Sequence, residues 1–377
     1  MAVSPSVFGE RHSLGLGRQI MARLRLDAPL LVGLLLISGF GLVVLWSAGG
    51  KDPGLLLRQL VRLGVAFGVL LAMAQVPPKL LRLWSPWLFL GGLLLLVAVL
   101  VAGDVGKGAQ RWLDLGVIRF QPSEIMKLAV PMMAAWYLHD RPLPPRLVEL
   151  AVVMALVVTP ALLIARQPDL GTALLVGSAG LLVVLLGGLR LRLIVLLGAA
   201  AAALAPVLWH FMHDYQRRRV LTLFNPESDP LGAGYHIIQS KIAIGSGGLF
   251  GKGWGNGSQA QLEFLPERST DFIFAVLGEE FGLLGLVFLM AAYLFLVGRG
   301  MYIALQAQDT YTRLLAGSIS LTFFVYVFVN TGMVTGLLPV VGVPLPLVSY
   351  GGTSMVTLMA GFGILMAING HRNLLAR

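Results

Sequence analysis

The stretch Glu263–Glu280 reads Glu-Phe-Leu-Pro-Glu-Arg-Ser-Thr-Asp-Phe-Ile-Phe-Ala-Val-Leu-Gly-Glu-Glu and sets charged residues directly against an apolar run. Charged residues make up only 12% of the chain, so their grouping here stands out. Asp271 lies where a polar segment becomes an apolar helix, and Glu279 and Glu280 lie within that helix. A carboxylate in such a helix is costly unless it is used, so the stretch predicts a membrane helix that carries a functional site.

The composition places the chain among polytopic membrane proteins. Of its 377 residues, 57% are hydrophobic, and the mean hydropathy is +0.82, whereas soluble domains average roughly 45–50% apolar residues. The net charge of +10 is spread thinly between apolar spans, which fits anionic lipid headgroups better than nucleic acid. The chain has no cysteine, which excludes disulfide, thiolate and iron–sulfur chemistry.

Ten apolar segments approach the length of a transmembrane helix, which is about 20 residues. We therefore expect an all-α integral membrane fold, a polytopic bundle of about ten transmembrane helices with no soluble domain. The expected spans are residues 29–48, 55–75, 85–103, 122–139, 147–165, 170–187, 191–211, 272–298, 313–336 and 351–370.

Basic residues indicate the orientation. Four arginines precede the first span, and basic residues recur in the short loops on the same side. Short cytoplasmic loops are rich in Lys and Arg, and an even number of spans returns the chain to its starting side, so both termini are expected in the cytoplasm. The expected organisation is a tail (1–28), one transmembrane domain (29–370) with a large extracytoplasmic loop (212–271), and a second tail (371–377). No secretory signal sequence is recognised before the first span, which is expected to remain as an anchor.

The long loop between spans seven and eight is far longer than a connection needs, and loops of that size are usually functional or disordered. This one contains aromatic and β-branched residues among many glycines, which permit tight turns and close backbone approach. We expect an ordered, partly re-entrant loop that lies over the bundle. Within it, Gln239 and Lys241 belong to an amphipathic segment at the interface and are candidate substrate contacts.

The other outer segment, residues 104–121, carries groups that suit a pyrophosphate and a sugar. Lys107, Arg111 and Trp112 lie within six residues of one another. Arg binds phosphate in a bidentate manner and Lys binds it as a point charge, and an indole can pack against a sugar. The alternative is a basic and aromatic belt at the membrane interface.

Two further motifs adjoin helix starts. Ser123 is expected to cap the fourth span, and Glu124 and Lys127 share one helical face, either as a ligand-binding pair or as an ion pair that eases insertion. Gln167 and Asp169 join the fifth and sixth spans, and Asp169 is either a site residue or only a helix cap.

Asp271 is the strongest catalytic candidate. A general base needs an accessible, partly desolvated carboxylate, and this position offers one. The alternative is a carboxylate favoured by the helix dipole or paired with Arg268. One of Glu279 and Glu280 is expected to line a cavity, and the other to pair with a basic group.

The segment Leu338–Ser354 leads into the last span. Its three prolines and three glycines exclude a continuous helix. Irregular backbone at membrane depth is tolerated only beside protein or a water-filled cavity. Ser349, Thr353 and Ser354, with Tyr350, are therefore expected to supply polar groups to a cavity.

Several motifs together resemble the SEDS family (shape, elongation, division, sporulation), and in order they cover nearly the whole chain. They are Lys107-Gly-Ala-Gln-Arg-Trp, Gln121-Pro-Ser-Glu, Gln167-Pro-Asp-Leu-Gly-Thr, Leu265-Pro-Glu-Arg-Ser-Thr-Asp-Phe-Ile-Phe-Ala and Pro346-Leu-Val-Ser-Tyr-Gly-Gly-Thr-Ser. The resemblance is to the rod-shape branch rather than the cell-division branch. It implies a peptidoglycan glycosyltransferase of the bacterial inner membrane that polymerises lipid II into β-1,4 glycan at the outer face during elongation.

The resemblance also implies residue roles and partners. The family's essential aspartate corresponds to Asp271, and its polar cavity residues correspond to Arg111, Trp112, Glu124, Lys127, Asp169 and the run Ser349–Ser354. The expected partners are lipid II, growing glycan, membrane lipids, a class B penicillin-binding protein and other rod-shape proteins, with no nucleic acid. No metal site is visible in the sequence, although a divalent cation (Mg or Mn) is a candidate cofactor.

Three alternative functions remain open at this point. A septal polymerase of the cell-division branch would share the same chemistry. A lipid flippase or other transporter fits ten helices with internal carboxylates, although coupled transporters usually bind ions near the midplane. A catalytically inert scaffold for a transpeptidase is the third alternative.

Overall fold

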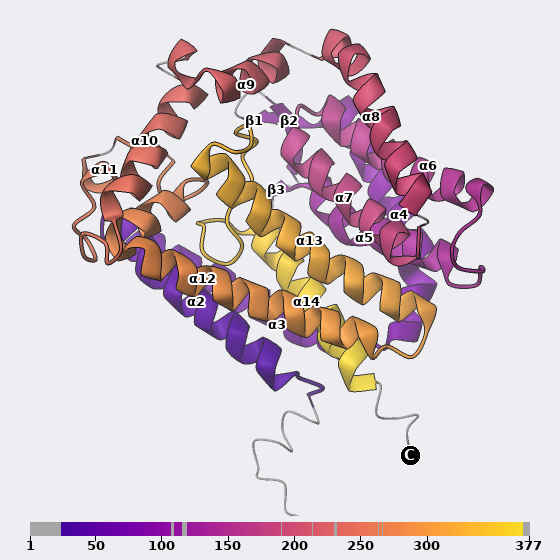
Figure 1. The fold of residues 1–377 in the computed structure, drawn as a ribbon. Coiled ribbons are helices and arrows are strands. Elements are labelled where there is room, and N and C mark those ends of the chain that lie inside the picture. Colours follow the sequence, from indigo (N-terminus) through magenta and orange to yellow (C-terminus); the bar gives the residue numbers. More distant parts are fainter. Residues whose placement is uncertain are drawn as a thin grey trace, which may run out of the picture.

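The computed structural model describes residues 24–106, 109–114, 119–189, 191–212, 214–229, 232–262, 264–265 and 267–371. Within them, ten long helices correspond to the ten expected spans, which confirms the all-α membrane fold (Figure 1). Seven helices in this part of the chain are long and apolar enough to cross a membrane. The ten are α2 (Ala28–Ala48), α3 (Pro53–Gln75), α4 (Pro78–Ala102), α5 (Pro122–Leu138), α6 (Leu147–Arg166), α7 (Leu170–Leu186), α8 (Leu191–Phe211), α12 (Ile273–Leu305), α13 (Thr310–Thr335) and α14 (Thr353–His371).

Short polar residues and prolines fix many of the helix starts. Asp27, Asp52 and Asp309 each accept a backbone N–H from the first turn of α2, α3 and α13, respectively. These bonds satisfy amide groups that have no partner inside the helix. Proline occupies the first turn of α2, α3, α4 and α5, where its missing N–H costs nothing.

Two helices are longer than expected. Helix α4 begins at Pro78, seven residues before the expected span, and continues through Pro86. A hydrogen bond from the Ser85 hydroxyl to the Leu81 carbonyl oxygen (2.8 Å) supports the backbone beside that proline. Helix α12 continues to Leu305, because no proline interrupts it after the apolar span ends.

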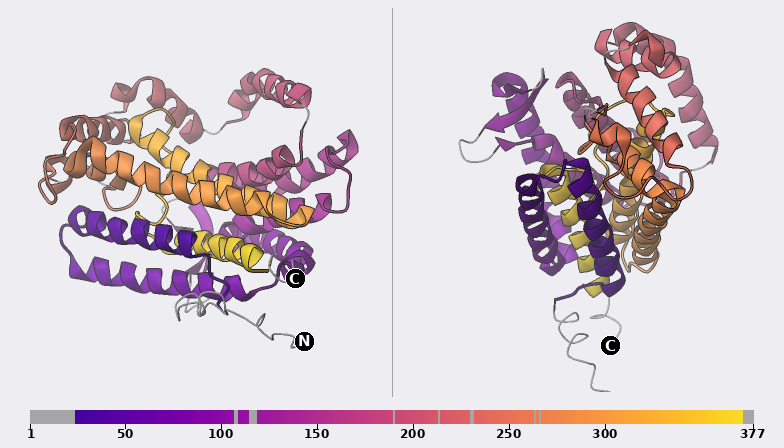
Figure 2. Two further views of the ribbon diagram at one scale, coloured as in Figure 1. Left: turned by 60° about the horizontal axis from the view of Figure 1, so that its bottom comes forward. Right: turned by 90° about the vertical axis from the view of Figure 1, so that its left-hand side faces the viewer.

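Helices α13 and α14 form the interior of the bundle. In their most apolar windows 67% and 61% of residues are buried, against 22% in α3, whose outer face remains exposed. Helix α14 packs along α3, and α13 packs against α12 and α7 (Figures 1 and 2). A Cβ atom on Gly363 of α14 would lie 2.6 Å from the Leu70 carbonyl oxygen of α3. The absence of a side chain there lets the two backbones approach closely, as in membrane bundles generally.

The two described ends of the chain meet at one end of the bundle. Arg25 contacts His371 (Nη1 to Nε2, 2.7 Å), and Asp27 accepts hydrogen bonds from Asn369 (2.9 Å) and Arg299 (2.7 Å). The long loop lies at the opposite end (Figure 1). An even number of spans places the two ends on the same side of the bundle, as observed here. Most residues of the expected terminal tails, 1–23 and 372–377, lie outside the described residues.

A small antiparallel sheet lies between α4 and α5. Its strands are β1 (Asp104–Gly106), β2 (Ala109–Asp114) and β3 (Arg119–Phe120), in the order β1-β2-β3. Asp104 pairs with Trp112, and Leu113 pairs with Phe120. The hairpin fixes Arg111 and Trp112 beside the start of α5, although the sequence analysis had assigned no strands to this segment.

The long loop contains helices α9 (Asp214–Phe224), α10 (Ala233–Gly247) and α11 (Ser258–Gln261), with a 3-10 turn η1 (Pro226–Ser228) between α9 and α10. Helix α10 packs on α12 and α13. A Cβ atom on Gly247 would lie 2.0 Å from the Gly278 carbonyl oxygen, so α10 and α12 touch through their backbones. Helix α10 is therefore folded onto the bundle.

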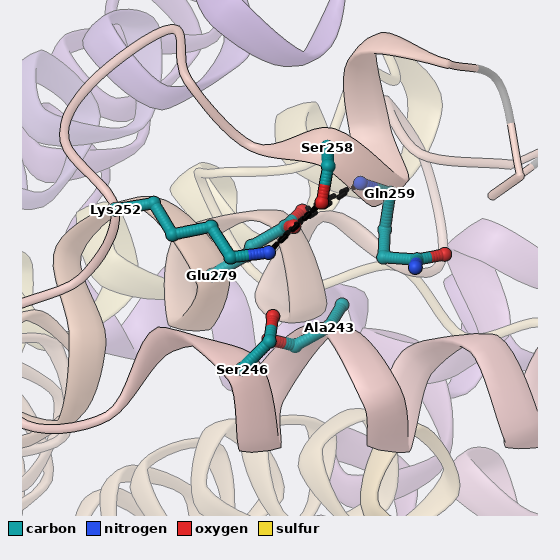
Figure 3. Close-up of polar contacts among 6 residues, drawn as sticks. All are labelled: Ala243, Ser246, Lys252, Ser258, Gln259 and Glu279. Atoms are coloured by element: carbon teal, nitrogen blue, oxygen red, sulfur yellow. Dashed lines mark hydrogen bonds and ion pairs between the residues drawn. The ribbon is translucent and has the colours of Figure 1, made fainter.

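A buried carboxylate, Glu279, attaches the second half of this loop to α12 (Figure 3), and its neighbour Glu280 connects α12 to α2. Glu279 is fully buried and accepts hydrogen bonds from Lys252 Nζ (2.7 Å), Ser258 Oγ (3.0 Å) and the Gln259 amide (3.1 Å). Glu280 accepts a hydrogen bond from Ser47 of α2. The expectation that one of these carboxylates lines the cavity is wrong, because both face away from it into the loop and α2. The expected pairing with a basic group is confirmed for Glu279.

Candidate active site

A polar cavity of about 310 Å³ lies at the end of the bundle that carries the long loop. We call it the polar cavity. Its lining comes from the β-hairpin, α5, α7, α13 and the two irregular segments that precede α12 and α14. The lining residues are Arg111, Trp112, Gln121, Glu124, Lys127, Asp169, Thr172, Leu175, Glu267, Thr270, Asp271, Tyr326, Gly342, Val343, Pro344, Tyr350, Gly351, Gly352, Thr353 and Ser354.

Asp271 lies two residues before the first residue of α12 and is partly exposed to the polar cavity. Its own backbone is fixed by α13, because Asn330 Nδ2 donates to the Asp271 carbonyl oxygen (3.0 Å) and to the Val343 carbonyl oxygen (2.7 Å). Gly342 has φ +76°, and a Cβ atom there would lie 3.5 Å from Asp271 Oδ2. The carboxylate thus lies beside the turn at Gly342 and lines the polar cavity.

The segment before α14 supports the Asp271 segment from the other side. The Tyr350 amide donates to the Ser269 carbonyl oxygen (2.8 Å), and the Ser349 hydroxyl donates to the Thr270 carbonyl oxygen. Gln59 of α3 holds the same segment through the Ser349 carbonyl oxygen (3.2 Å) and the Gly351 amide (3.4 Å). Residues about 80 positions apart in the sequence therefore form one rigid wall of the cavity.

Glu124 and Lys127 form an ion pair at the start of α5, with 2.6 Å between Oε1 and Nζ. Both side chains are buried, and Lys127 Nζ lies 5.2 Å from the ring centre of Tyr326. The other Glu124 oxygen, Oε2, has no hydrogen-bond partner among the described residues. The expected pairing is confirmed. The expected cap is wrong, because Gln121 occupies the cap position and the Ser123 hydroxyl is buried without a partner in that part of the chain.

Asp169 is both the cap of α7 and a cavity residue. Its Oδ1 accepts the Thr172 amide (3.2 Å), and its Oδ2 accepts Gln121 Nε2 (2.9 Å). The Arg111 guanidinium donates to the carbonyl oxygens of Gln167 (3.3 Å) and Pro168. Because these partners are neutral, the interaction leaves the positive charge of Arg111 available to a ligand.

The structure separates the sequence-predicted residues into three groups. Eight line the polar cavity: Arg111, Trp112, Glu124, Lys127, Asp169, Asp271, Thr353 and Ser354. Two lie behind its wall, since Gln167 donates to the Leu96 carbonyl oxygen (2.9 Å) and Ser349 accepts the Leu345 amide (2.8 Å). Gln239 and Lys241 lie on α10 and are not among the lining residues, and Lys107 lies outside the described residues. Ligand binding by any of these residues stays a prediction.

Several residues that line the cavity were not predicted from the sequence. Gln121 and Thr172 stand inside motifs that it quoted, and Glu267 and Thr270 directly precede Asp271. Tyr326 interrupts the apolar run from Phe323 to Val329, which is the signal that could have identified it.

An apolar groove of about 760 Å³ adjoins the polar cavity. It is lined by Val61, Arg62, Val65, Met73, Leu81, Leu88, Trp112, Glu124, Ile125, Leu128, Ala129, Met132, Gly352, Thr353, Val356, Thr357, Ala360 and Ile364, from α3, α4, α5, α14 and the segments beside them. Trp112, Glu124, Gly352 and Thr353 line both spaces. The two together fit an amphiphile with a charged head and a long apolar chain.

A comparison with protein-family models decides the family. Residues 25–374 match the model described as "Cell cycle protein", which covers FtsW, RodA and SpoVE. The chain belongs to this family. Its members include the peptidoglycan glycosyltransferase MrdB of Escherichia coli (strain K12), which is 54% identical over 94% of this chain and 96% of that protein. A probable peptidoglycan glycosyltransferase FtsW of Geobacter sulfurreducens is 36% identical over 94% of this chain and 98% of that protein.

Solved structures of family members have the same fold. A chain in the structure described as "Structural coordination of polymerization and crosslinking by a peptidoglycan synthase complex" is 34% identical, with a TM-score of 0.81 over 92% of this chain and 98% of that chain. The rod shape determining protein RodA of Thermus thermophilus is 32% identical, with a TM-score of 0.70 over 92% of this chain and 97% of that chain.

Proposed function

We infer that this family member is a peptidoglycan glycosyltransferase, which polymerises lipid II into β-1,4 glycan during cell elongation. The observation that carries this inference is the position of Asp271 in a polar cavity that continues into an apolar groove. Lipid II has the matching parts: sugars and a pyrophosphate on a polyprenyl chain. The higher identity to MrdB than to the FtsW relatives supports the elongation branch rather than the septal one.

Asp271 is proposed as the general base. Its carboxylate removes the proton from the 4-hydroxyl group of the acceptor sugar as that oxygen attacks the anomeric carbon of the donor. The bond from the anomeric carbon to the pyrophosphate oxygen breaks, and the electron pair leaves with undecaprenyl pyrophosphate. A single displacement inverts the anomeric centre from the α-linked donor to a β-1,4 linkage. The two hydrogen bonds that fix the Asp271 and Val343 carbonyl oxygens support precise placement of the carboxylate.

The pyrophosphate leaving group does not need protonation by a general acid, provided that the negative charge that develops on it is stabilised. Arg111 suits this role, because its hydrogen-bond partners are neutral carbonyl groups. Lys127 is already paired with Glu124, so its net charge toward a ligand is smaller. We therefore assign charge stabilisation mainly to Arg111, and assign Lys127 and Glu124 to the orientation of substrate hydroxyl and phosphate groups.

A divalent cation remains a proposal. No group of three or more His, Asp or Glu side chains within the described residues is arranged to hold a metal ion. We propose that a cation, if used, takes phosphate oxygens of the substrate among its ligands, because these described residues offer no preformed group of three protein ligands. The steps above are assigned to protein side chains.

We further propose that both termini are cytoplasmic, which places the polar cavity at the outer leaflet where lipid II is polymerised. The clustering of both described chain ends opposite the cavity supports this topology. A class B penicillin-binding protein is the proposed partner, and the similarity to a chain of a peptidoglycan synthase complex supports it.

The decisive experiment is polymerisation of purified lipid II by the wild type and by Asp271→Asn, each with and without the transpeptidase partner. Asn is nearly isosteric but cannot accept the proton, and loss of a positioned base costs about 10²–10⁴-fold in rate. Polymer from the wild type and almost none from the variant is the expected result. Parental activity in the variant would refute the base assignment. No polymer from folded, partner-bound wild type would instead favour a transporter or a scaffold.

A further inference from the structure

Arg62 lies inside the membrane-spanning part of α3, in a position that the function above does not explain. It is nine residues beyond the start of the helix, which corresponds to about 14 Å along the helix axis. The side chain is half-buried and lines the apolar groove. A charged group at that depth is costly and usually marks a functional position.

The contacts of Arg62 leave its charge unpaired. The guanidinium carbon lies 4.3 Å from the ring centre of Tyr350, a cation–π contact. No carboxylate in the described part of the chain lies within ion-pair distance of Arg62. Arg58, one turn earlier, differs, because it is more exposed and pairs with Asp52 (3.5 Å).

Arg62 also marks the boundary between the two spaces. It lines the apolar groove, and the Tyr350 ring against which it packs lines the polar cavity. Gly352, which lines both, leaves room for it: a Cβ atom there would lie 3.3 Å from Arg62 Cδ and 3.4 Å from Nε. A guanidinium held by one face on an aromatic ring still offers N–H donors at its edges.

We propose that Arg62 binds the pyrophosphate of a polyprenyl pyrophosphate whose chain lies in the apolar groove. This assignment rests on the proposed function and deepens it by locating the charged group of the bound lipid. An amphiphile in the groove must place its first polar group where the apolar lining ends, and Arg62 supplies a bidentate donor there. The Tyr350 contact holds the guanidinium at the boundary, and the glycine at 352 keeps its edge accessible.

The test compares binding of undecaprenyl pyrophosphate and undecaprenol to the purified full-length protein in nanodiscs. Arg62→Gln is expected to weaken pyrophosphate-lipid binding about 10-fold or more, because a charge-assisted hydrogen-bonding group is lost. Binding of undecaprenol is expected to change less than twofold. Arg62→Lys should recover part of the affinity. Arg313→Gln, which removes an exposed arginine near the opposite end of the bundle, is the matched control and should bind like the wild type.

A second measurement needs no variant. Phenylglyoxal modifies accessible arginine side chains, and mass spectrometry reports the extent at each one. Undecaprenyl pyrophosphate should protect Arg62 in the wild type, undecaprenol should not, and Arg313 should react equally in both. Unchanged pyrophosphate affinity in folded Arg62→Gln, equal loss of both ligands, or no protection of Arg62 would each overturn the proposal.

Both the lipid II monomer and the growing glycan strand carry a polyprenyl pyrophosphate, and turnover assays show which of the two Arg62 binds. If Arg62 binds the lipid II monomer, Arg62→Gln raises KM for lipid II with unchanged product length. If it binds the pyrophosphate of the growing strand, the variant releases shorter glycans at an unchanged KM. Wild-type protein that makes no polymer but binds undecaprenyl pyrophosphate through Arg62 would refute the proposed function and leave this assignment standing.

Discussion

At the scale of single residues, the polar cavity combines groups whose charges are compensated to different degrees. Lys127 is neutralised by Glu124 at 2.6 Å, and Asp169 is satisfied by Gln121 and the α7 amide. Arg111 donates to the neutral carbonyl oxygens of Gln167 and Pro168. Among the described cavity residues, Arg111 is thus better suited than Lys127 to a developing phosphate charge.

Replacement of Arg111 tests that conclusion. Arg111→Gln is expected to lower kcat for lipid II polymerisation by about 10²-fold, the usual effect of losing one transition-state donor. Arg111→Lys keeps the charge without the bidentate geometry, so its kcat should lie between the values for the wild type and Arg111→Gln. Arg111 also bonds the turn at residues 167–168, so thermal unfolding temperatures of the variants serve as the control for a loss of structure. A kcat near the parental value in a folded Arg111→Gln variant would argue against the role.

His236 predicts a pH effect on stability. The ring stacks on Phe272 (5.4 Å between centres), next to Asp271, and its Nδ1 is buried without a hydrogen-bond partner among the described residues. Burial lowers the pKa of His236 below its ordinary value of 6.5, against the opposing effect of Glu267 and Asp229. The folded state therefore favours neutral imidazole. Its stabilisation is complete above the unfolded pKa and is lost as the pH falls through the lower folded pKa.

Unfolding temperatures between pH 7.5 and 5 will test this effect. The wild type is expected to lose stability as the pH falls below about 6.5. His236→Gln does not titrate in this range, so it should show a shallower pH dependence. Parallel curves for the two proteins would show that protonation of His236 does not contribute.

At the scale of elements, the cavity is assembled from irregular segments that are held by helices. Asn330 of α13 and Gln59 of α3 fix the loops before α12 and α14 through four hydrogen bonds to their backbones. Glu279 of α12 fixes the loop between α10 and α12 by accepting hydrogen bonds from Lys252, Ser258 and Gln259. Buried polar groups are costly without partners, so each such network permits only one arrangement of its loop.

Glu279→Gln tests the attachment of that loop. The substitution leaves Lys252 without its anionic partner and weakens the bonds from Ser258 and Gln259, so a loss of about 3 kcal/mol is expected. Hydrogen exchange should accelerate across residues 250–262. Glu227→Gln, an exposed carboxylate in the same loop, is the control. Equal exchange in all three proteins would show that the loop is held by other contacts.

At the scale of the whole molecule, the polar cavity and the apolar groove form one continuous binding region. The groove runs between α3, α4, α5 and α14, and the cavity lies where these helices meet the hairpin and the long loop. Sugar chemistry is thereby placed beside a surface that accepts a lipid chain. This arrangement predicts that the length of the polyprenyl chain affects turnover.

Thr357→Trp places an indole in the groove, far from Asp271 in sequence and on the apolar side. We expect about a 10-fold rise in KM for lipid II, because the indole displaces about two methylene groups of the lipid chain, whose burial contributes roughly 0.8 kcal/mol each. An analogue with a short prenyl chain should be less affected. Leu94→Trp, at an exposed position of α4 outside the groove lining, is the control. Equal effects on long and short substrates would place the lipid chain elsewhere.

The sequence by itself determined the membrane class, the approximate limits of the ten helices and the motifs that carry the site. These properties follow from local hydrophobicity, proline and glycine positions and short polar runs, all of which act over a few residues. The positions of Asp271, Asp169 and the Glu124–Lys127 pair at helix starts were therefore predicted correctly from the sequence. The predicted cap of α5, Ser123, was wrong.

Only the tertiary structure decided which polar residues share the cavity. It brings Asp271, Arg111 and Thr353 together, turns Glu279 and Glu280 away, and places Gln167 and Ser349 behind the wall. It also places Arg62 at the junction of groove and cavity, whereas the sequence shows only a charged residue inside an apolar span. The physical reason is that the direction of a side chain across a bundle depends on packing and hydrogen bonds between segments far apart in sequence, which no local pattern specifies.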